Sequence, residues 1–152
     1  MELITPIIVD TNFLSDYLAG RPAAKVTMRK LLQAHYYCVT TAITVAELWF
    51  GQHRRRWQEK RTQALARLIA SLKVFPFTEE HAVLYGQVRA TLMDRGEDIG
   101  FADTVIAAIA LKEQIALLTA DIDDFKRIEG LKLLPYHASP RKSRPSGQER
   151  TA

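Results

Sequence analysis

Four acidic residues of this sequence stand where an α/β fold would bring carboxylates together: Asp10, Glu47, Asp103 and Asp121. Asp10 ends a short apolar run and Asp121 follows another, while Glu47 and Asp103 fall in the first turns of expected helices. Carboxylates that converge without His or Cys form a hard oxygen site suited to Mg²⁺, or to Mn²⁺, rather than to zinc. Such an ion can activate a water and neutralise a phosphodiester, so the implied chemistry is phosphodiester hydrolysis.

Each acid also has a purely structural interpretation. A carboxylate at a helix N-terminus contributes about 0.3–1 kcal/mol by complementing the helix dipole. Asp10 could cap a helix, the sequence from Thr44 to Glu47 fits a capping box, and Asp121 could cap the last helix. Asp103 is harder to explain this way, because it lies among apolar residues where an ionised carboxylate needs a counter-charge.

Short apolar runs predict the strands that would position these acids. They cover residues 7–9, 35–39, 73–77, 116–118 and 131–134. Because the runs are nearly continuous in apolar residues, they are typical of a mostly parallel sheet buried on both faces. Pro76 places the third run at an edge of the sheet. In such sheets ligands bind outside the carboxyl ends of the strands, where the acids stand.

Helical patterns alternate with these strands. They cover residues 11–19, 22–33, 44–52, 57–71, 79–95, 101–112 and 123–127. The segment 101–112 is apolar almost all round, which predicts a central, buried helix. Val83, Leu84, Val88 and Leu92 form the expected apolar side of the helix 79–95. This order predicts an α/β sandwich with right-handed crossovers.

Composition limits the class of protein. The chain has 152 residues, of which 47% are apolar and 25% charged, as expected for one globular domain. The single cysteine, Cys38, excludes an intramolecular disulfide and is expected to be a buried, inert thiol. The four histidines are not spaced as a ligand set and are expected at the surface. Without a membrane-length apolar stretch or a basic leader, we expect no membrane association and a cytoplasmic location.

The positive charge is concentrated in two places. Of the formal charge of +4, residues 139–152 carry +3, leaving a domain of residues 1–138 that is nearly neutral. This tail holds Arg141, Lys142, Arg144 and Arg150 against Glu149, and its composition predicts disorder. It could contact phosphates or only keep the protein soluble.

The second basic cluster runs from His53 to Arg61 and includes Trp57. It is either a solvated helix face or a stripe that binds a polyanion, with Trp57 available for stacking on a base.

Four motifs in order resemble the PIN-domain family, in particular the VapC-type ribonuclease toxins of bacterial type II toxin–antitoxin systems. The resemblance covers about residues 5–135. Its motifs are Val9–Asn12; Ile43–Leu48 with Gly51; Gly96 through Ile99 to Asp103 with Ile106–Ala108; and Leu118–Asp121 with Asp124–Phe125 and Ile128–Leu131.

The resemblance implies a three-layer, Rossmann-like PIN sandwich with a mostly parallel five-stranded sheet. It also implies a Mg²⁺-dependent endoribonuclease that forms a homodimer and is held inactive by a cognate antitoxin. Asp10 and Asp103 would be the principal metal ligands, with Glu47 and Asp121 completing the pocket directly or through water. Polar supports would come from Thr11, Asn12 and Thr119. Asp124 matches an acid of the family pattern but is equally explained as a first-turn helix acid.

An acidic pocket repels RNA until metal fills it, so basic residues must hold the RNA backbone. The first candidates are Arg54, Arg55, Arg56 and Lys60, with Arg21 and Arg89 behind them. The residues Leu31, Leu32, Tyr36 and Tyr37 could supply a dimer surface or pack in the core.

Other functions compete with this one. A PIN nuclease that processes RNA or cleaves DNA outside toxin–antitoxin pairs, or a catalytically silent scaffold, would share the same fold. A haloacid-dehalogenase-type phosphatase needs a second Asp where this sequence has Asn12. A nucleotide-binding module is disfavoured because no glycine-rich phosphate loop is present.

Overall fold

A computed structural model describes residues 4–56 and 58–138. Its centre is a sheet with strand order β3-β2-β1-β4-β5 in which every neighbouring pair is parallel. The strands are β1 (Thr5–Val9), β2 (Tyr36–Thr41), β3 (Lys73–Phe75), β4 (Ala116–Thr119) and β5 (Leu133–Pro135). The predicted five-stranded sheet is confirmed, and β3 lies at its edge, next to Pro76, as expected.

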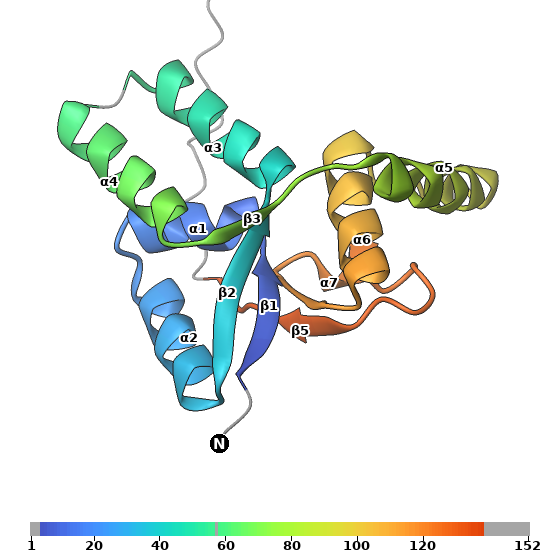
Figure 1. Cartoon of the computed structure of the whole chain (residues 1–152), viewed down its shortest axis with the longest axis horizontal. Coiled ribbons are helices and arrows are strands. Elements are labelled where there is room, and N and C mark those ends of the chain that lie inside the picture. The colour runs from blue at the N-terminus through green and yellow to red at the C-terminus, as the bar shows by residue number, and fades with distance from the viewer. Residues whose placement is uncertain (1–3, 57, 139–152) are drawn as a thin grey trace, which may run out of the picture.

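The helices of the described residues follow the predicted alternation. They are α1 (Thr11–Leu18), α2 (Pro22–Gln33), α3 (Ala42–Arg54), α4 (Glu59–Ala70), α5 (Glu79–Asp94), α6 (Phe101–Glu113) and α7 (Ile122–Phe125). Figure 1 shows α1 to α4 on one side of the sheet and α5 to α7 on the other. The layers therefore form the predicted three-layer α/β sandwich.

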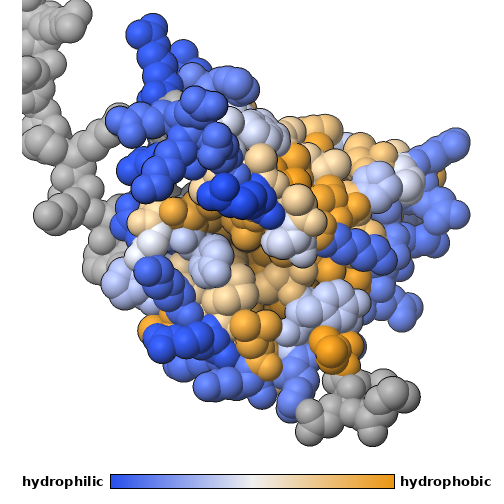
Figure 2. All heavy atoms as spheres, turned by 60° about the vertical axis from the view of Figure 1, so that its left-hand side comes forward, coloured by the Kyte–Doolittle hydropathy of each residue, from blue (hydrophilic) through white to orange (hydrophobic). Residues whose placement is uncertain are grey.

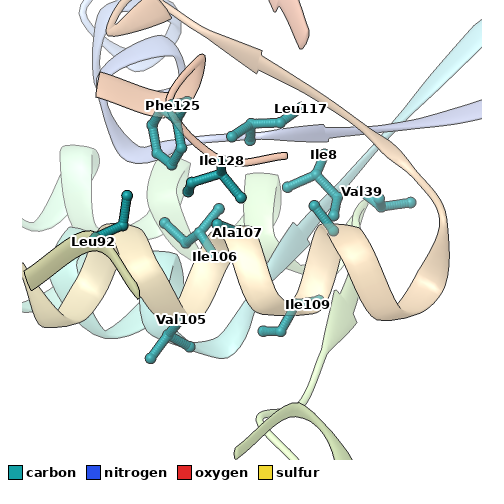
Figure 3. Packing of buried hydrophobic residues seen from close by; sticks show 11 residues of the cluster. Ile8, Val39, Leu92, Val105, Ile106, Ala107, Ile109, Leu117, Phe125 and Ile128 are labelled. Atoms are coloured by element: carbon teal, nitrogen blue, oxygen red, sulfur yellow. The ribbon is translucent and has the colours of Figure 1, made fainter. Parts of the chain in front are cut away.

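Neighbouring residues of β1 enter opposite cores, because side chains alternate across a strand. Ile7 and Val9 pack with Phe13 and Leu65 beneath α1 to α4, whereas Ile8 packs in the core under α6. The side chains of the second core, including Leu117 and Phe125, surround the sheet-facing side of α6 (Figure 3). Burial of both faces explains why the strand runs are apolar throughout.

Helix α6 is the buried central helix that the sequence predicts. Residues 104–110 are all buried, and only the first residue, Phe101, is a large apolar side chain exposed to solvent. Burying each large aliphatic side chain contributes roughly 1.5–3 kcal/mol, so this helix anchors its own N-terminus firmly. That rigidity matters because Asp103 lies in the first turn of α6.

The start of α3 differs from the prediction. The helix begins at Ala42, two residues early, because the hydroxyl of Thr41 accepts a 3.2 Å hydrogen bond from the Thr44 N–H and caps it. Thr44 is therefore a buried interior residue, and the capping-box interpretation of Thr44 and Glu47 is wrong. Glu47 falls in the second turn of α3 rather than the first, which removes the helix-capping explanation for this acid.

Two surface assignments on α5 are also wrong. His81, expected at the surface, is buried: its Nδ1 accepts the Thr78 N–H at 3.0 Å, and its Nε2 lies 2.9 Å from Glu113 Oε1. The ring thus caps α5 and ties it to the end of α6. Val83, one of the apolar residues expected to pack on α5, is 62% exposed, because the helical period places it on the face opposite the buried Leu92.

Of the four residues considered for a dimer surface, two pack in the core and two are exposed. Leu31 and Tyr36 pack in the core, whereas Leu32 and Tyr37 are exposed. Cys38 is half-buried, and burial raises the pKa of its thiol to about 11, which fits the predicted inert cysteine. Within the described ranges, no helix is long and apolar enough to span a membrane.

Candidate active site

The candidate site lies where the strand order reverses. The chain moves from β1 to β2 and β3 on one side of the sheet, then crosses to β4 and β5 on the other. Asp10 follows the end of β1 and Thr119 ends the neighbouring β4, so both reach the crevice between two diverging connections. This is the position at which open parallel sheets bind their ligands.

Asp10 is the most buried of the four acids, with 5% of its surface exposed. Its Oδ1 accepts a 3.2 Å hydrogen bond from the Phe13 N–H, which caps α1, and its Oδ2 accepts a 2.9 Å bond from the Thr119 hydroxyl. The capping interpretation is therefore confirmed for Asp10. It does not exclude a role in the site, since each carboxylate oxygen keeps a further lone pair.

The predicted polar supports contact the other acids directly. The Thr11 hydroxyl donates a 2.8 Å hydrogen bond to Glu47 Oε1, and the Asn12 amide donates a 3.4 Å bond to Asp121 Oδ2. Thr119 also accepts the Asp121 N–H at 3.0 Å. Side-chain contacts thus connect the start of α1 with Glu47 of α3 and with the end of β4.

Asp103 completes the group from α6. Within the described part of the chain its carboxylate accepts no hydrogen bond, although it is half-buried. Burial, together with the negative charges of Asp121, Glu47, Asp10 and Asp124, raises the pKa of Asp103 to about 6. The four predicted acids therefore lie near enough for the charges of three of them to affect the fourth, Asp103, and Asp124 affects Asp103 as well.

Asp10 is affected in the same way. Burial raises its pKa to about 6 against the lowering effect of its hydrogen bonds with Phe13 and Thr119, and the charges of Asp121 and Glu47 add to the rise. Two carboxyls with raised pKa values in one crevice are typical of a functional site. A bound cation would lower both pKa values, because it favours the ionised form.

These residues fit a hard divalent cation of the magnesium type. The donors are carboxylate oxygens, and three of the four carboxylates are already oriented by hydrogen bonds. Among the described residues, no group of three Asp, Glu, His or Cys side chains lies close enough together to hold an ion without other ligands. Mg²⁺ suits such an arrangement, because it keeps several waters and needs only one or two protein carboxylates.

The candidate RNA contacts lie at the turn between α3 and α4. Arg54 ends α3, Arg55 and Arg56 form the turn, and Lys60 lies in the first turn of α4; all four are exposed. A small pocket of about 120 Å³ between this turn and α1 is lined by Arg55 and Arg61. Trp57 and the tail of residues 139–152 lie outside the described residues.

The two secondary candidates are already paired with acids. Arg21 Nε lies 3.2 Å from Asp16 Oδ1, and Arg89 donates two 3.2 Å hydrogen bonds to Asp98. Their charges are largely compensated within the fold, which leaves the α3–α4 turn as the stronger candidate surface.

Asp16 and Tyr136 form a buried pair that the sequence analysis missed. The Tyr136 hydroxyl donates a 2.8 Å hydrogen bond to Asp16 Oδ2, and both residues are buried. Asp16 lies three residues after the core residue Phe13, so the helical period places it on the buried face of α1. That position was the available signal for a buried acid with a partner.

An apolar pocket of about 590 Å³ lies away from the acids, on the face formed by α2 and the end of β5. Val26, Leu31 and Leu134 contribute to it, and its lining includes no carboxylate from the part of the chain that the structure describes. Figure 2, which brings this side of the molecule forward, shows hydrophobic side chains exposed between strongly charged groups.

The fold is that of a parallel α/β sandwich in which acidic side chains lie near the reversal of strand order. The sequence model of the PIN domain matches residues 7–131, so this chain belongs to the PIN domain family. The predicted resemblance is confirmed.

Several individual proteins are similar to this chain in sequence or in structure. Ribonuclease VapC2 of Haemophilus influenzae is 29% identical over 125 residues, which cover 82% of this chain and 93% of that protein. Toxin FitB of Neisseria gonorrhoeae is 30% identical over 140 residues, covering 86% and 99%. The crystal structure of VapBC2 from Rickettsia felis, bound to a promoter DNA fragment, has a chain that matches with a TM-score of 0.78 and 26% identity. That match covers 88% of this chain and all of the other.

Proposed function

We propose that this protein is a Mg²⁺-dependent endoribonuclease and the toxin of a VapBC-type toxin–antitoxin pair. The single observation that carries the proposal is the raised pKa of Asp10 and Asp103 near the reversal of strand order, to which the charges of Glu47 and Asp121 contribute. The similarity to proteins named ribonuclease VapC and toxin FitB supports the class of reaction.

Asp10 and Asp103 would be the principal ligands of the ion, because the raised pKa of each carboxyl indicates a site where its negative charge needs a cation. Glu47 and Asp121 would bind it directly or through water. The bound ion supplies a polarised water and compensates the charge of the phosphodiester. Mn²⁺ would suit the same oxygen donors.

The protein's own contribution is orientation. Thr119 and the Phe13 N–H fix both oxygens of Asp10, and Thr11 fixes Glu47. Side chains that are already held in place lose little entropy when the reaction geometry forms. Positioning accelerates a reaction for this reason. Asp124 would add negative charge near Asp103 without a fixed hydrogen bond to it.

Arg54, Arg55, Arg56 and Lys60 would hold the RNA backbone beside the acids. They are exposed and close together in the chain, as phosphate contacts require. Such contacts fix the position of the RNA and carry no base preference of their own.

We also propose a cognate antitoxin and a second copy of this chain as partners. The antitoxin is supported by the toxin–antitoxin complex among the similar structures. The homodimer is supported by large apolar side chains exposed on α3, α5 and α6, namely Phe50, Val83 and Phe101.

Cleavage of RNA doubly labelled at its two ends tests the proposal. We expect internal cuts with Mg²⁺, none with EDTA, and none in DNA of the same sequence. Transfer, ribosomal and messenger RNA should all be tried, because the base preference depends on loop shape. Metal-independent cleavage, or no cleavage of any RNA, would contradict the proposal.

A further inference from the structure

Helices α1 and α3 lie side by side from the acidic residues to the α3–α4 turn (Figure 1). Near their starts, the Thr11 hydroxyl donates a 2.8 Å hydrogen bond to Glu47 Oε1. Further along, Ser15 of α1 and Arg55, which directly follows α3, line the same small pocket. The helical period places Ser15 on the face of Thr11, and Gly51 and Arg55 on the face of Glu47. Arg55 therefore lies about 12 Å beyond Glu47 along the helix axis.

The surface between Glu47 and Arg55 is open at Gly51. A Cβ atom placed on this glycine would have no heavy atom within 4 Å. The neighbouring side chains on this part of α3, Leu48 and Gln52, are buried. No exposed side chain of α3 therefore fills this face between the acid and the arginine, and an extended ligand can lie along the helix from one to the other.

The pocket beside Arg55 has the size of one small anionic group. Its volume is about 120 Å³, and its lining within the described residues contains two cations and no carboxylate. At about 30 Å³ for each water, the pocket has room for roughly four waters, which is enough for a phosphate group and too little for a nucleobase with its ribose. The lining residues are Ser15, Leu18, Ala19, Arg55, Arg61 and Ala64.

The polar groups of the pocket suit a phosphate. A guanidinium carries five N–H donors in a planar fork that matches phosphate oxygens, so Arg55 and Arg61 can each donate to a phosphate beside any other partner. Ser15 supplies a hydroxyl donor, and Arg61 lies in the first turn of α4, where the helix dipole favours an anion. Asp16, which follows Ser15, is buried with its own partners, so its charge is compensated elsewhere.

We propose that Arg55 and Arg61 together bind one internal backbone phosphate of an RNA strand in this pocket, while the phosphodiester to be cut lies at the acids. The inference rests on the proposed nuclease function for its substrate. Phosphate contacts fix the position of a bound strand. A phosphate held about 12 Å along α3 from Glu47 would therefore determine which phosphodiester of the strand reaches the acids.

The first comparison removes the two cations of the pocket. The pocket variant combines Arg55→Gln with Arg61→Gln. The control variant combines Arg29→Gln with Arg67→Gln, which changes the net charge equally at exposed arginines of α2 and α4 that do not line the pocket. All variants are made in the full-length chain carrying Asp10→Asn and Asp103→Asn, here the parent protein, so that bound RNA is not cut.

The second comparison blocks the open surface without changing any charge. Gly51→Met places a side chain on the face between Glu47 and Arg55. Gly86→Met on α5 is the matched control, because a Cβ atom at Gly86 also has no heavy atom within 4 Å. Met is a better helix former than Gly, so neither change should destabilise its helix. Unchanged or raised unfolding temperatures would show that the variants are folded.

The affinity for a short single-stranded RNA with a 3′-fluorescein and no 5′-phosphate is measured by anisotropy over a series of KCl concentrations. We expect the pocket variant to bind about ten- to a hundredfold more weakly at low salt, as the loss of charged hydrogen bonds predicts. Its salt slope should be smaller by about 0.7, the value for one phosphate contact. Gly51→Met should show the same smaller slope, and both controls should bind as the parent protein does.

Three results would overturn the inference. The first is equal weakening in the pocket variant and its arginine control, which would indicate diffuse attraction. The second is a salt slope smaller by about 1.4, which would mean that the two arginines bind separate phosphates. The third is binding by Gly51→Met as tight as that of Gly86→Met, because the strand would then not lie along α3.

A 5′-phosphorylated copy of the same RNA distinguishes an internal from a terminal phosphate. Equal dependence of both RNAs on Arg55 and Arg61 supports an internal phosphate, whereas weakening of the phosphorylated RNA alone would overturn it. Failure of the proposed nuclease has a different signature. A wild-type protein that cuts no RNA, although the binding results hold, would contradict the nuclease and leave the phosphate pocket intact.

Discussion

The hydroxyl of Thr119 donates a 2.9 Å hydrogen bond to Oδ2 of Asp10, joining the ends of the neighbouring strands β4 and β1. The same hydroxyl accepts the Asp121 N–H, and the Thr119 carbonyl accepts the Tyr136 N–H. Thr119 is fully buried, so water cannot replace a partner that is lost from one of these hydrogen bonds, and breaking any of them costs free energy. One threonine thus positions two of the four acids and the exit of the chain.

Replacing Thr119 by Val tests this arrangement. Thr119→Val keeps the shape but removes the donor to a buried carboxylate, so we expect a loss of about 1–3 kcal/mol in the free energy of unfolding. RNA cleavage should fall about tenfold, because Asp10 loses its fixed orientation. Thr119→Ser restores the hydroxyl and should retain most of both. A Val variant that cuts RNA as fast as the wild type would show that Thr119 is only structural.

The raised pKa of Asp10 predicts an unusual pH dependence of stability without metal. The pKa of Asp10 is about 6 in the folded protein and has its ordinary value in the unfolded chain. Between about pH 4 and pH 6, its carboxyl is therefore more protonated in the folded than in the unfolded state. The free energy of unfolding should therefore fall as pH rises through that window, by about 2 kcal/mol from this residue.

Chemical denaturation across this pH range, in EDTA, measures the effect. Asp10→Asn should reduce the fall, because the amide keeps an acceptor for the Phe13 N–H and carries no charge, and the part that remains should come from Asp103. Adding Mg²⁺ at pH 7 should stabilise the wild type more than the variant. A fall of equal size in wild type and variant would assign the pH dependence to other groups.

Tyr136→Phe should destabilise the fold. It removes the donor to the buried Asp16 carboxylate and leaves Arg21 as the remaining partner of that acid, so we expect a loss of about 1–2 kcal/mol. Tyr37→Phe, at an exposed position, is the matched control and should change the free energy of unfolding by less than about 0.5 kcal/mol. Equal effects of the two changes would mean that the Asp16 contact contributes nothing measurable.

Charge reversal in the α3–α4 turn should separate RNA binding from metal binding. In the triple variant Arg54→Glu, Arg55→Glu and Arg56→Glu, the KM for RNA should rise at least about tenfold, since several phosphate contacts become repulsive. The Mg²⁺-induced rise in unfolding temperature should persist, because the substitutions leave the carboxylates untouched. Loss of both properties in parallel would show that the turn acts on the site as a whole.

The sheet and its order of elements could be predicted because apolar runs and helical periods are local signals. The position of Asp10 and Thr119 at the ends of neighbouring strands could also be predicted, since the ends of parallel strands meet at one edge. The start of α3 could not be placed correctly, because Thr41 and Thr44 are both good caps by residue type. Both are fully buried, and the hydrogen bond from the Thr44 N–H to the Thr41 hydroxyl identifies Thr41 as the cap.

The buried polar pairs were the main omission. His81 with Glu113, and Asp16 with Tyr136, join residues that are far apart in the chain, so no local pattern identifies the partner. Taken alone, a His or an Asp in a helix is typical of a solvated surface. His81 is buried because α5 packs on α6, and Asp16 is buried because Tyr136, just after β5, packs against it.

The most direct test is the rate of RNA cleavage by wild type, Asp103→Asn and Asp94→Asn, with Mg²⁺ and with EDTA. Asp94 is an exposed acid at the end of α5, and its substitution changes the net charge by the same amount. Loss of a metal-ligating carboxylate should lower the rate by at least about a hundredfold, whereas Asp94→Asn should cut as the wild type does. If Asp103→Asn cuts RNA as fast as Asp94→Asn, the acidic group is not a metal-dependent active site.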